Sequence, residues 1–95
     1  MSQYYSANFL RRLRNDILID DVIVNLLNLQ VRNEHQILRF RCPLCLNFHT
    51  ATNHKTNLAM CIDCQKNFNP FDLVMTVAKC NFVDAVQFLK DSIEQ

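Results

Sequence analysis

The sequence predicts an α+β fold, in which a small ribbon of three or more short antiparallel strands is flanked by helices. Two cysteine pairs with the spacing C-x2-C-x15-C-x2-C lie in the middle of the chain. Stretches with strand-like alternation surround these pairs, and helical periodicity with capping residues fills both ends. Since the chain has 95 residues, of which 49% are hydrophobic, we expect one domain with its own core. We expect that domain, residues 1–95, to consist of a helical lead-in (6–28), the ribbon (29–68) and C-terminal helices (69–93).

The helical lead-in is expected to contain two helices, over residues 6–14 and 17–28. Ser6 can cap the first helix, because its hydroxyl can accept a hydrogen bond from a backbone N–H of the first turn. Asn15 and Asp16 can cap the second in the same way. The second helix is apolar around most of its circumference, so it belongs either to the core or to a partner interface.

The ribbon is predicted from alternation and from polar turns. Leu38 and Phe40 alternate with Arg39 and Arg41, which is typical of a half-exposed strand that runs into the first cysteine pair. Two further strands are expected around a polar turn, at residues 48–52 and 58–61. Cysteine pair, hairpin and second cysteine pair therefore follow one another along the chain.

The C-terminal region predicts two capped helices. In the tetrapeptide Asn-Pro-Phe-Asp at residues 69–72, the asparagine can cap, the proline suits the first helical position, and the aspartate can bond back to the cap. Asn81, followed by Asp84, predicts the start of the last helix. Both helices carry apolar residues with helical spacing, which we expect to be buried core. These are Phe71, Val74, Met75 and Ala78, then Phe82, Ala85, Val86, Leu89 and Ile93.

The four paired cysteines, Cys42, Cys45, Cys61 and Cys64, are expected to bind one Zn²⁺. Zinc prefers four soft ligands in a tetrahedron, and a closed set of four thiolates leaves no position for a reacting water. The site is therefore interpreted as structural. Disulfides are the alternative, but five cysteines are an odd number, and neither a signal peptide nor an apolar run of about 18 residues is found. A reducing, cytoplasmic setting is expected.

Other residues near the cysteine pairs carry secondary expectations. Because the chain has no glycine, Asn47 and Asn67 are expected to take the positive-φ backbone that usually follows a zinc knuckle, as a metal-binding Cys-x2-Cys turn is called. His49 and His54 lie between the pairs and are weaker alternatives as metal ligands. Cys80 is expected to be a small apolar residue inside a helix.

These motifs together resemble the zinc-binding domain of bacterial and phage DNA primases, whose usual ligand set is Cys-His-Cys-Cys. Cys42-Pro43-Leu44-Cys45 matches its first knuckle, with cysteine in place of the usual histidine, and Cys61-Ile62-Asp63-Cys64 matches its second. The family's patterns after the metal site match Asp72-Leu73-Val74-Met75 and the six residues from Asn81 to Val86. The resemblance covers residues 9–93.

The resemblance implies a module that binds the single-stranded DNA template beside a separate catalytic primase or polymerase subunit, with no catalytic residues of its own. Single strands are bound by basic residues, which contact phosphates, and by flat side chains, on which bases stack. Thr50 and Thr52 are expected to add hydrogen bonds from the sheet. No membrane and no small-molecule substrate is expected. The candidate nucleic-acid residues are Arg39, Arg41, Phe48, His49, Lys55 and Lys66.

The alternative function is a protein-interaction adaptor that uses the ribbon as a rigid scaffold. The broad apolar helix at residues 17–28 and the arginines before it favour this hypothesis. The expected partner-binding residues are Arg12, Arg14, Ile23 and Leu27. A net charge of +1 distinguishes neither hypothesis, because any nucleic-acid function depends on where the basic residues lie.

Overall fold

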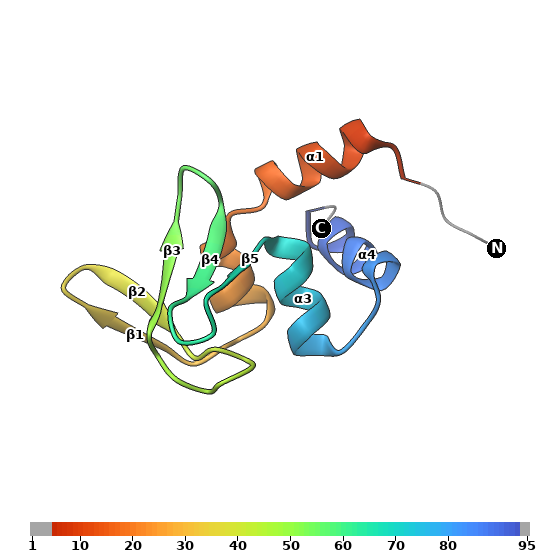
Figure 1. Cartoon of the computed structure of the whole chain (residues 1–95). Coiled ribbons are helices and arrows are strands. Elements are labelled where there is room, and N and C mark those ends of the chain that lie inside the picture. Colours follow the sequence, from red (N-terminus) through yellow and green to blue (C-terminus); the bar gives the residue numbers. More distant parts are fainter. Residues whose placement is uncertain (1–4, 94–95) are drawn as a thin grey trace.

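The computed structural model describes residues 5–93 and confirms the α+β fold. Helices lie at both ends of the chain, and two small antiparallel sheets lie between them (Figure 1). No helix within residues 5–93 has the length and apolar character needed to cross a membrane. The elements are α1 (Ala7–Asp16), α2 (Ile19–Asp21), the π-helix η1 (Val22–Leu26), β1 (Val31–Glu34), β2 (Ile37–Phe40), β3 (Thr50–Asn53), β4 (Leu58–Cys61), β5 (Lys66–Phe68), α3 (Pro70–Ala78) and α4 (Phe82–Ile93).

The first sheet is a hairpin of β1 and β2, where the sequence predicted a single strand. Its turn is formed by His35 and Gln36, which both have positive φ values, of 53° and 67°. Positive φ at both central positions is the pattern of a type I′ turn, which normally requires asparagine or glycine. The hairpin was missed because neither turn residue is of that kind. It projects from the rest of the molecule (Figure 1).

The second sheet has the order β3-β4-β5 and contains the two strands predicted around the polar turn, together with β5. The buried Thr50 side chain joins it to the first sheet. The Thr50 hydroxyl donates to the Phe40 carbonyl (2.6 Å) and accepts from the Phe40 N–H (2.7 Å). Both bonding capacities of this hydroxyl are used inside the fold, so the expectation that Thr50 presents it to nucleic acid is wrong.

The boundary between the two lead-in helices differs from the prediction. Asn15 and Asp16 belong to the last turn of α1 and do not cap a second helix. Ser6 does cap α1, accepting from the Phe9 N–H. The chain then turns through an extended segment before α2, which has no side-chain cap of its own. Asn57, in the turn before β4, supplies the missing partner, since its Oδ1 accepts from the Ile19 N–H at 2.8 Å.

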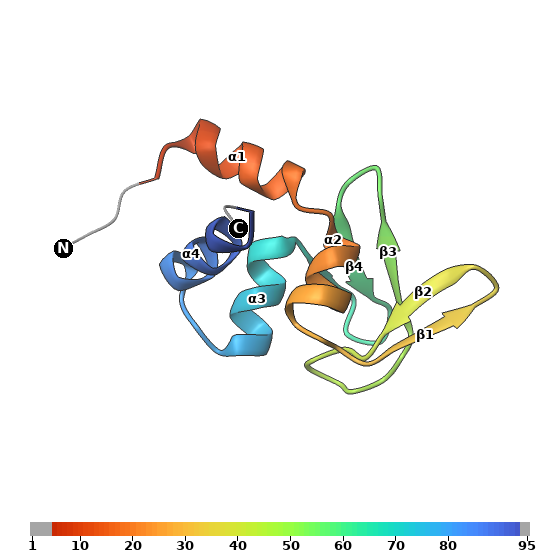
Figure 2. The same cartoon turned by 180° about the vertical axis from the view of Figure 1, so that it is seen from behind.

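The apolar face of the second lead-in helix belongs to the core. Val22 and Ile23 are fully buried, and α2 with η1 lies between α3 and the strands (Figure 2). A five-residue π-turn replaces the regular α-helix, and Asn28 follows with a φ of 52° that suits the end of a helix. The helix therefore ends at Leu26. Because Ile23 is fully buried, it is not accessible to a partner.

The C-terminal helices begin as predicted. Asn69 and Asp72 form a reciprocal capping box at the start of α3, and Asn81 accepts from the Asp84 N–H at the start of α4. Core residues such as Phe71, Val74, Ala85, Val86 and Leu89 are buried.

The predicted apolar faces extend too far at their edges. Ala78 and Ile93 are exposed, and so is much of Phe82, whereas Leu73 is fully buried although it was not predicted to be. Cys80 is half-buried in the connection between α3 and α4, so its placement inside a helix is also wrong.

Candidate metal centre and nucleic-acid interface

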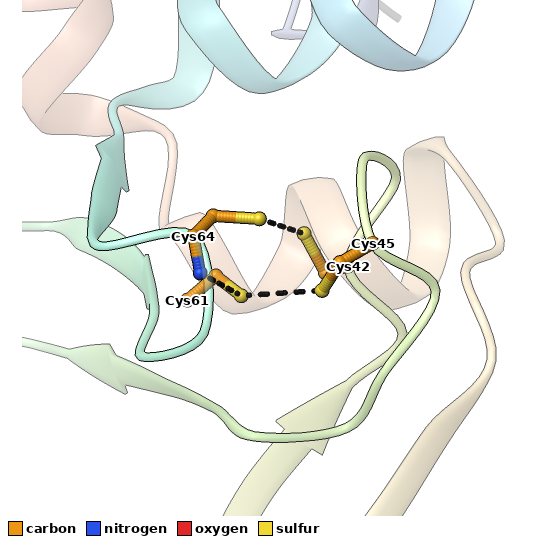
Figure 3. A group of neighbouring side chains, drawn as sticks. All are labelled: Cys42, Cys45, Cys61 and Cys64. Atoms are coloured by element: carbon orange, nitrogen blue, oxygen red, sulfur yellow. Dashed lines mark hydrogen bonds between the residues drawn. The ribbon is translucent and has the colours of Figure 1, made fainter.

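The two cysteine pairs approach each other from different sheets. Cys42 and Cys45 lie in the turn that follows β2, whereas Cys61 ends β4 and Cys64 lies in the turn before β5. Their four sulfur atoms point toward one another across the gap between the turns (Figure 3). Cysteines 16 to 22 positions apart in the sequence are thus brought into one cluster by the folding of the ribbon.

The geometry of the cluster fits a tetrahedral ion. The four Sγ atoms all lie within 4.8 Å of one another, with 3.8 Å between Cys42 and Cys64 and 3.6 Å between Cys45 and Cys61. Four sulfurs at zinc–sulfur bond length around one ion would be separated by about 3.8 Å. Two of the thiols are also hydrogen-bonded by backbone N–H groups, of Leu44 to Cys42 and of Cys64 to Cys61, both at 3.4 Å. The four cysteines can therefore hold one metal ion.

The turns that present these thiols have the left-handed backbone typical of such sites, but at other residues than predicted. Leu46 and Gln65, each directly after the second cysteine of its pair, have φ values of 67° and 51°. Asn47 and Asn67 do not have positive φ, because the positive-φ residue of each turn comes one or two residues earlier. Leucine is a costly choice at such a position, about 1–2 kcal/mol above its right-handed conformation.

The cluster places thiols in unequal electrostatic surroundings. Burial raises the pKa of Cys61, and burial together with the three neighbouring thiols raises the pKa of Cys64 to about 12. Burial also acts on Cys42, but hydrogen bonds from the N–H groups of Cys45 and Leu44 outweigh it and lower the pKa of Cys42. Without a cation the thiols of Cys61 and Cys64 are protonated at neutral pH, so binding a metal must release protons.

Asp63, between the cysteines of the second pair, connects the two knuckles. His49 Nδ1 lies 3.0 Å from Asp63 Oδ2, and Asn47 donates to the same oxygen at 3.1 Å. These hydrogen bonds hold the pKa of Asp63 below its usual range. The second histidine, His54, instead contacts Asp20 in α2 at 2.8 Å. Neither histidine belongs to the metal cluster.

A groove of about 620 Å³ lies beside the metal cluster, between the β1–β2 hairpin and the two knuckles. It brings together three of the predicted nucleic-acid residues, Arg39, Phe48 and His49. The Arg39 guanidinium is held in place, because its Nη1 donates to the Thr50 carbonyl at 2.8 Å. Two apolar side chains of the knuckles, Leu46 and Ile62, also line the groove and are largely exposed.

The groove also contains an arginine that the sequence prediction missed. Arg32 lies on β1 directly opposite Arg39 on β2, and its guanidinium carbon is 4.0 Å from the centre of the Phe48 ring. Arg32 could have been identified only from the register of the β1–β2 hairpin. Once residues 31–34 and 37–40 are paired, the two arginines necessarily share a face.

Three other predicted nucleic-acid residues are not part of the groove lining. Arg41 follows β2, where it contacts Gln30 at 3.4 Å. Lys55 is exposed in the β3–β4 turn, and Lys66 in β5 places its amine 5.4 Å from the centre of the Phe68 ring.

The predicted partner-binding residues do not form one surface. Arg12 and Arg14 are exposed on α1, and Leu27 is half-buried after η1. Ile23, by contrast, is 0% exposed within the core, so its assignment as a partner contact is wrong. The physical reason is that the helix it occupies is enclosed between α3 and the sheets (Figure 2).

Comparisons with known proteins place no further constraint on the chain. No family model matches the sequence, no curated protein matches it, and no solved structure matches its fold. The likeness to primase zinc-binding domains therefore stays a prediction from motifs, and the function must be argued from the cysteine cluster and the groove beside it.

Proposed function

We propose that this chain is a zinc-stabilised module that binds single-stranded DNA in the groove beside its metal cluster. In this proposal it presents template within a DNA-priming complex in the cytoplasm, and a separate primase or polymerase subunit carries the chemistry. The isolated chain makes no primers. The observation that carries the proposal is the convergence of Arg32, Arg39, Phe48 and His49 on one groove.

The chemistry of the groove supports a single strand over a duplex. Arginine forks suit phosphate oxygens, and the exposed ring of His49 and the half-buried ring of Phe48 are flat surfaces for unstacked bases. In a duplex the bases are already stacked and paired, so these rings would find no partner. The zinc assignment is supported by the set of four thiols, because soft ligands in a closed tetrahedron favour Zn²⁺.

Binding to a fluorescent oligothymidine of twelve nucleotides, measured by anisotropy across a salt series, tests the proposal. We expect affinity to fall with rising salt, because bound phosphates release counterions. The double variant Arg32→Gln/Arg39→Gln should bind about tenfold more weakly, since two solvent-accessible charge contacts of up to about 1 kcal/mol each are lost. Its salt dependence should be shallower by about 0.7 for each phosphate contact removed from a single strand.

The control for this test is Arg12→Gln, combined with a duplex of equal length. Arg12 lies on α1 and outside the groove lining, so removing its charge should change affinity much less. Equal losses from Arg12→Gln and Arg32→Gln would show that net charge, not the groove, attracts the strand. The proposal would also be wrong if the metal-loaded wild-type chain bound neither probe.

The adaptor remains a second candidate function, because another groove fits an acidic protein partner. This groove, of about 410 Å³, lies between α1 and the starts of α3 and α4. Leu10 and Phe82 give it an apolar floor, and Arg11 and Arg14 line its edge. Neither arginine forms an ion pair with any residue in the range 5–93. An acidic amphipathic helix would complement this combination.

Charge reversal tests this second candidate. A protein that co-purifies with the wild-type chain from its host through this groove should be lost with Arg11→Glu/Arg14→Glu. The same protein should be retained by Arg32→Gln/Arg39→Gln, because those arginines lie in the other groove. Retention by the charge-reversal variant would exclude the α1 groove as the partner site.

A further inference from the structure

The groove beside the metal cluster contains two positive charges at directly paired positions of the β1–β2 hairpin. Arg32 and Arg39 are direct cross-strand partners, so their side chains leave the same face of the β1–β2 ribbon. Like charges placed opposite each other destabilise a strand pair. A hairpin that retains such a pair either compensates it within the fold or uses it to attract an anion.

Glu34 provides part of that compensation. It lies two residues after Arg32 on the same face of β1, and its Oε2 is 3.4 Å from Arg39 Nε. It is also the only acidic residue among those that line the groove within the described chain. One carboxylate therefore faces two guanidinium groups, and the face keeps an excess positive charge.

The two arginines are positioned before any ligand arrives. Arg39 Nη1 is engaged by the Thr50 carbonyl, which leaves the Nε edge of the guanidinium for the carboxylate. Arg32 lies over the Phe48 ring. A carboxylate and a phosphate both present paired oxygens to the edge of a guanidinium, so Glu34 occupies the place where a phosphate would bind.

We propose that Arg32 and Arg39 form a phosphate subsite of the groove, which Glu34 occupies in the free chain and leaves when a backbone phosphate of the strand binds. This inference rests on the proposed nucleic-acid function and specifies how the site is regulated. The exchange meets little resistance, because the Glu34 side chain is 47% exposed and makes one long contact, of 3.4 Å, with the partly buried Arg39. The phosphate gains what Glu34 lacks, since its oxygens can be shared between both arginines.

The variant Glu34→Gln tests the exchange with the same twelve-nucleotide oligothymidine. We expect it to bind about three- to tenfold more tightly than wild type, because an internal competitor and a repelling charge are both removed. Asp91→Asn is the matched control. It changes net charge equally on the exposed face of α4, outside the groove, and should change affinity less than about twofold.

A double-mutant cycle separates the subsite from general electrostatics. In an Arg39→Gln background the gain from Glu34→Gln should shrink toward the gain of Asp91→Asn, since the guanidinium with which Glu34 pairs is gone. Should Arg39→Gln fail to fold or to load metal, Arg39→Lys serves as the background, because it keeps the charge but lacks the fork. The gain should shrink there as well.

Each outcome decides between the possibilities. Tight binding by wild type without any gain in Glu34→Gln beyond that of Asp91→Asn would overturn the subsite and leave the proposed function intact. A gain of undiminished size in the Arg39→Gln background would overturn it too. No binding by wild type would overturn both proposals, because the proposed function requires the unaltered chain to bind the strand.

Discussion

Cys45→Ser is expected to abolish metal binding and to remove most of the folded population at 25 °C. A structural zinc site contributes about 10–16 kcal/mol of apparent binding free energy, whereas a domain of this size is stable by only about 5–15 kcal/mol. An ion bound by the four thiols would join turns from two separate sheets, so its loss would remove a link that the small core cannot replace. Circular dichroism melting curves, with metal analysis of the same samples, measure the effect.

Cys80→Ser is the control for the metal prediction. Cys80 is half-buried and lies outside the cluster, so this variant should still bind one metal ion and melt within a few degrees of wild type. A Cys45→Ser protein that contains no metal yet melts like wild type would contradict the prediction.

The same site makes stability depend on pH in one direction. Bound thiolates carry no protons, whereas the metal-free thiols do, with the pKa of Cys61 raised and that of Cys64 raised to about 12. The metal-free chain therefore binds more protons, and stability rises with pH and falls on acidification as protons displace the ion.

Asn57→Ala should destabilise the metal-loaded chain by about 3–5 kcal/mol, which is large for one exchange. The Asn57 amide donates to the carbonyls of Arg14 and Ile17, both at 2.7 Å, and its oxygen accepts from the Ile19 N–H. Alanine leaves these groups in or near the core without partners. It also places a poorly suited residue at a φ of 57°. Urea unfolding followed by circular dichroism gives the free energy of unfolding.

Two matched variants separate the causes of that loss. Glycine tolerates the positive φ but lacks the side-chain amide. Any loss in the free energy of unfolding that remains in Asn57→Gly is therefore due to the missing hydrogen bonds. Asn53→Ala removes an asparagine from the same loop whose oxygen only accepts from the exposed backbone of Lys55 and Thr56. It should cost about 1 kcal/mol or less. Equal losses from Asn53→Ala and Asn57→Ala would show that Asn57 has no special role.

The parts of the fold that depend on neighbouring residues could be predicted from the sequence. Helix caps at Ser6, Asn69 and Asn81 act over three residues, and the spacing of the cysteine pairs defines their turns. The break between α1 and α2 could not be predicted, because its partner, Asn57, lies 38 residues beyond Ile19. Capping from such a distance leaves no local pattern.

In the candidate site, too, local sequence patterns predicted some features, and features that depend on distant residues were missed. Periodicity identified an apolar face that includes Ile23, but it cannot distinguish a face covered by the protein's own helices from one covered by a partner. The sequence likewise identified Arg39 and Lys55 as basic residues close to the cysteines along the chain. Only the strand register shows that Arg39 faces Arg32 in a groove, while Lys55 lies at the far turn.

The position of the groove has a thermodynamic consequence for the metal. Its walls include Leu46 and Ile62, which belong to opposite knuckles, so an ion bound by the four thiols would hold both knuckles together and stabilise the groove in this shape. Any ligand that binds only this closed form is energetically coupled to the ion, and such coupling is reciprocal. A strand in the groove would tighten zinc binding by the same factor by which zinc tightens strand binding. Each chain would then release its ion most readily when it is not engaged on template.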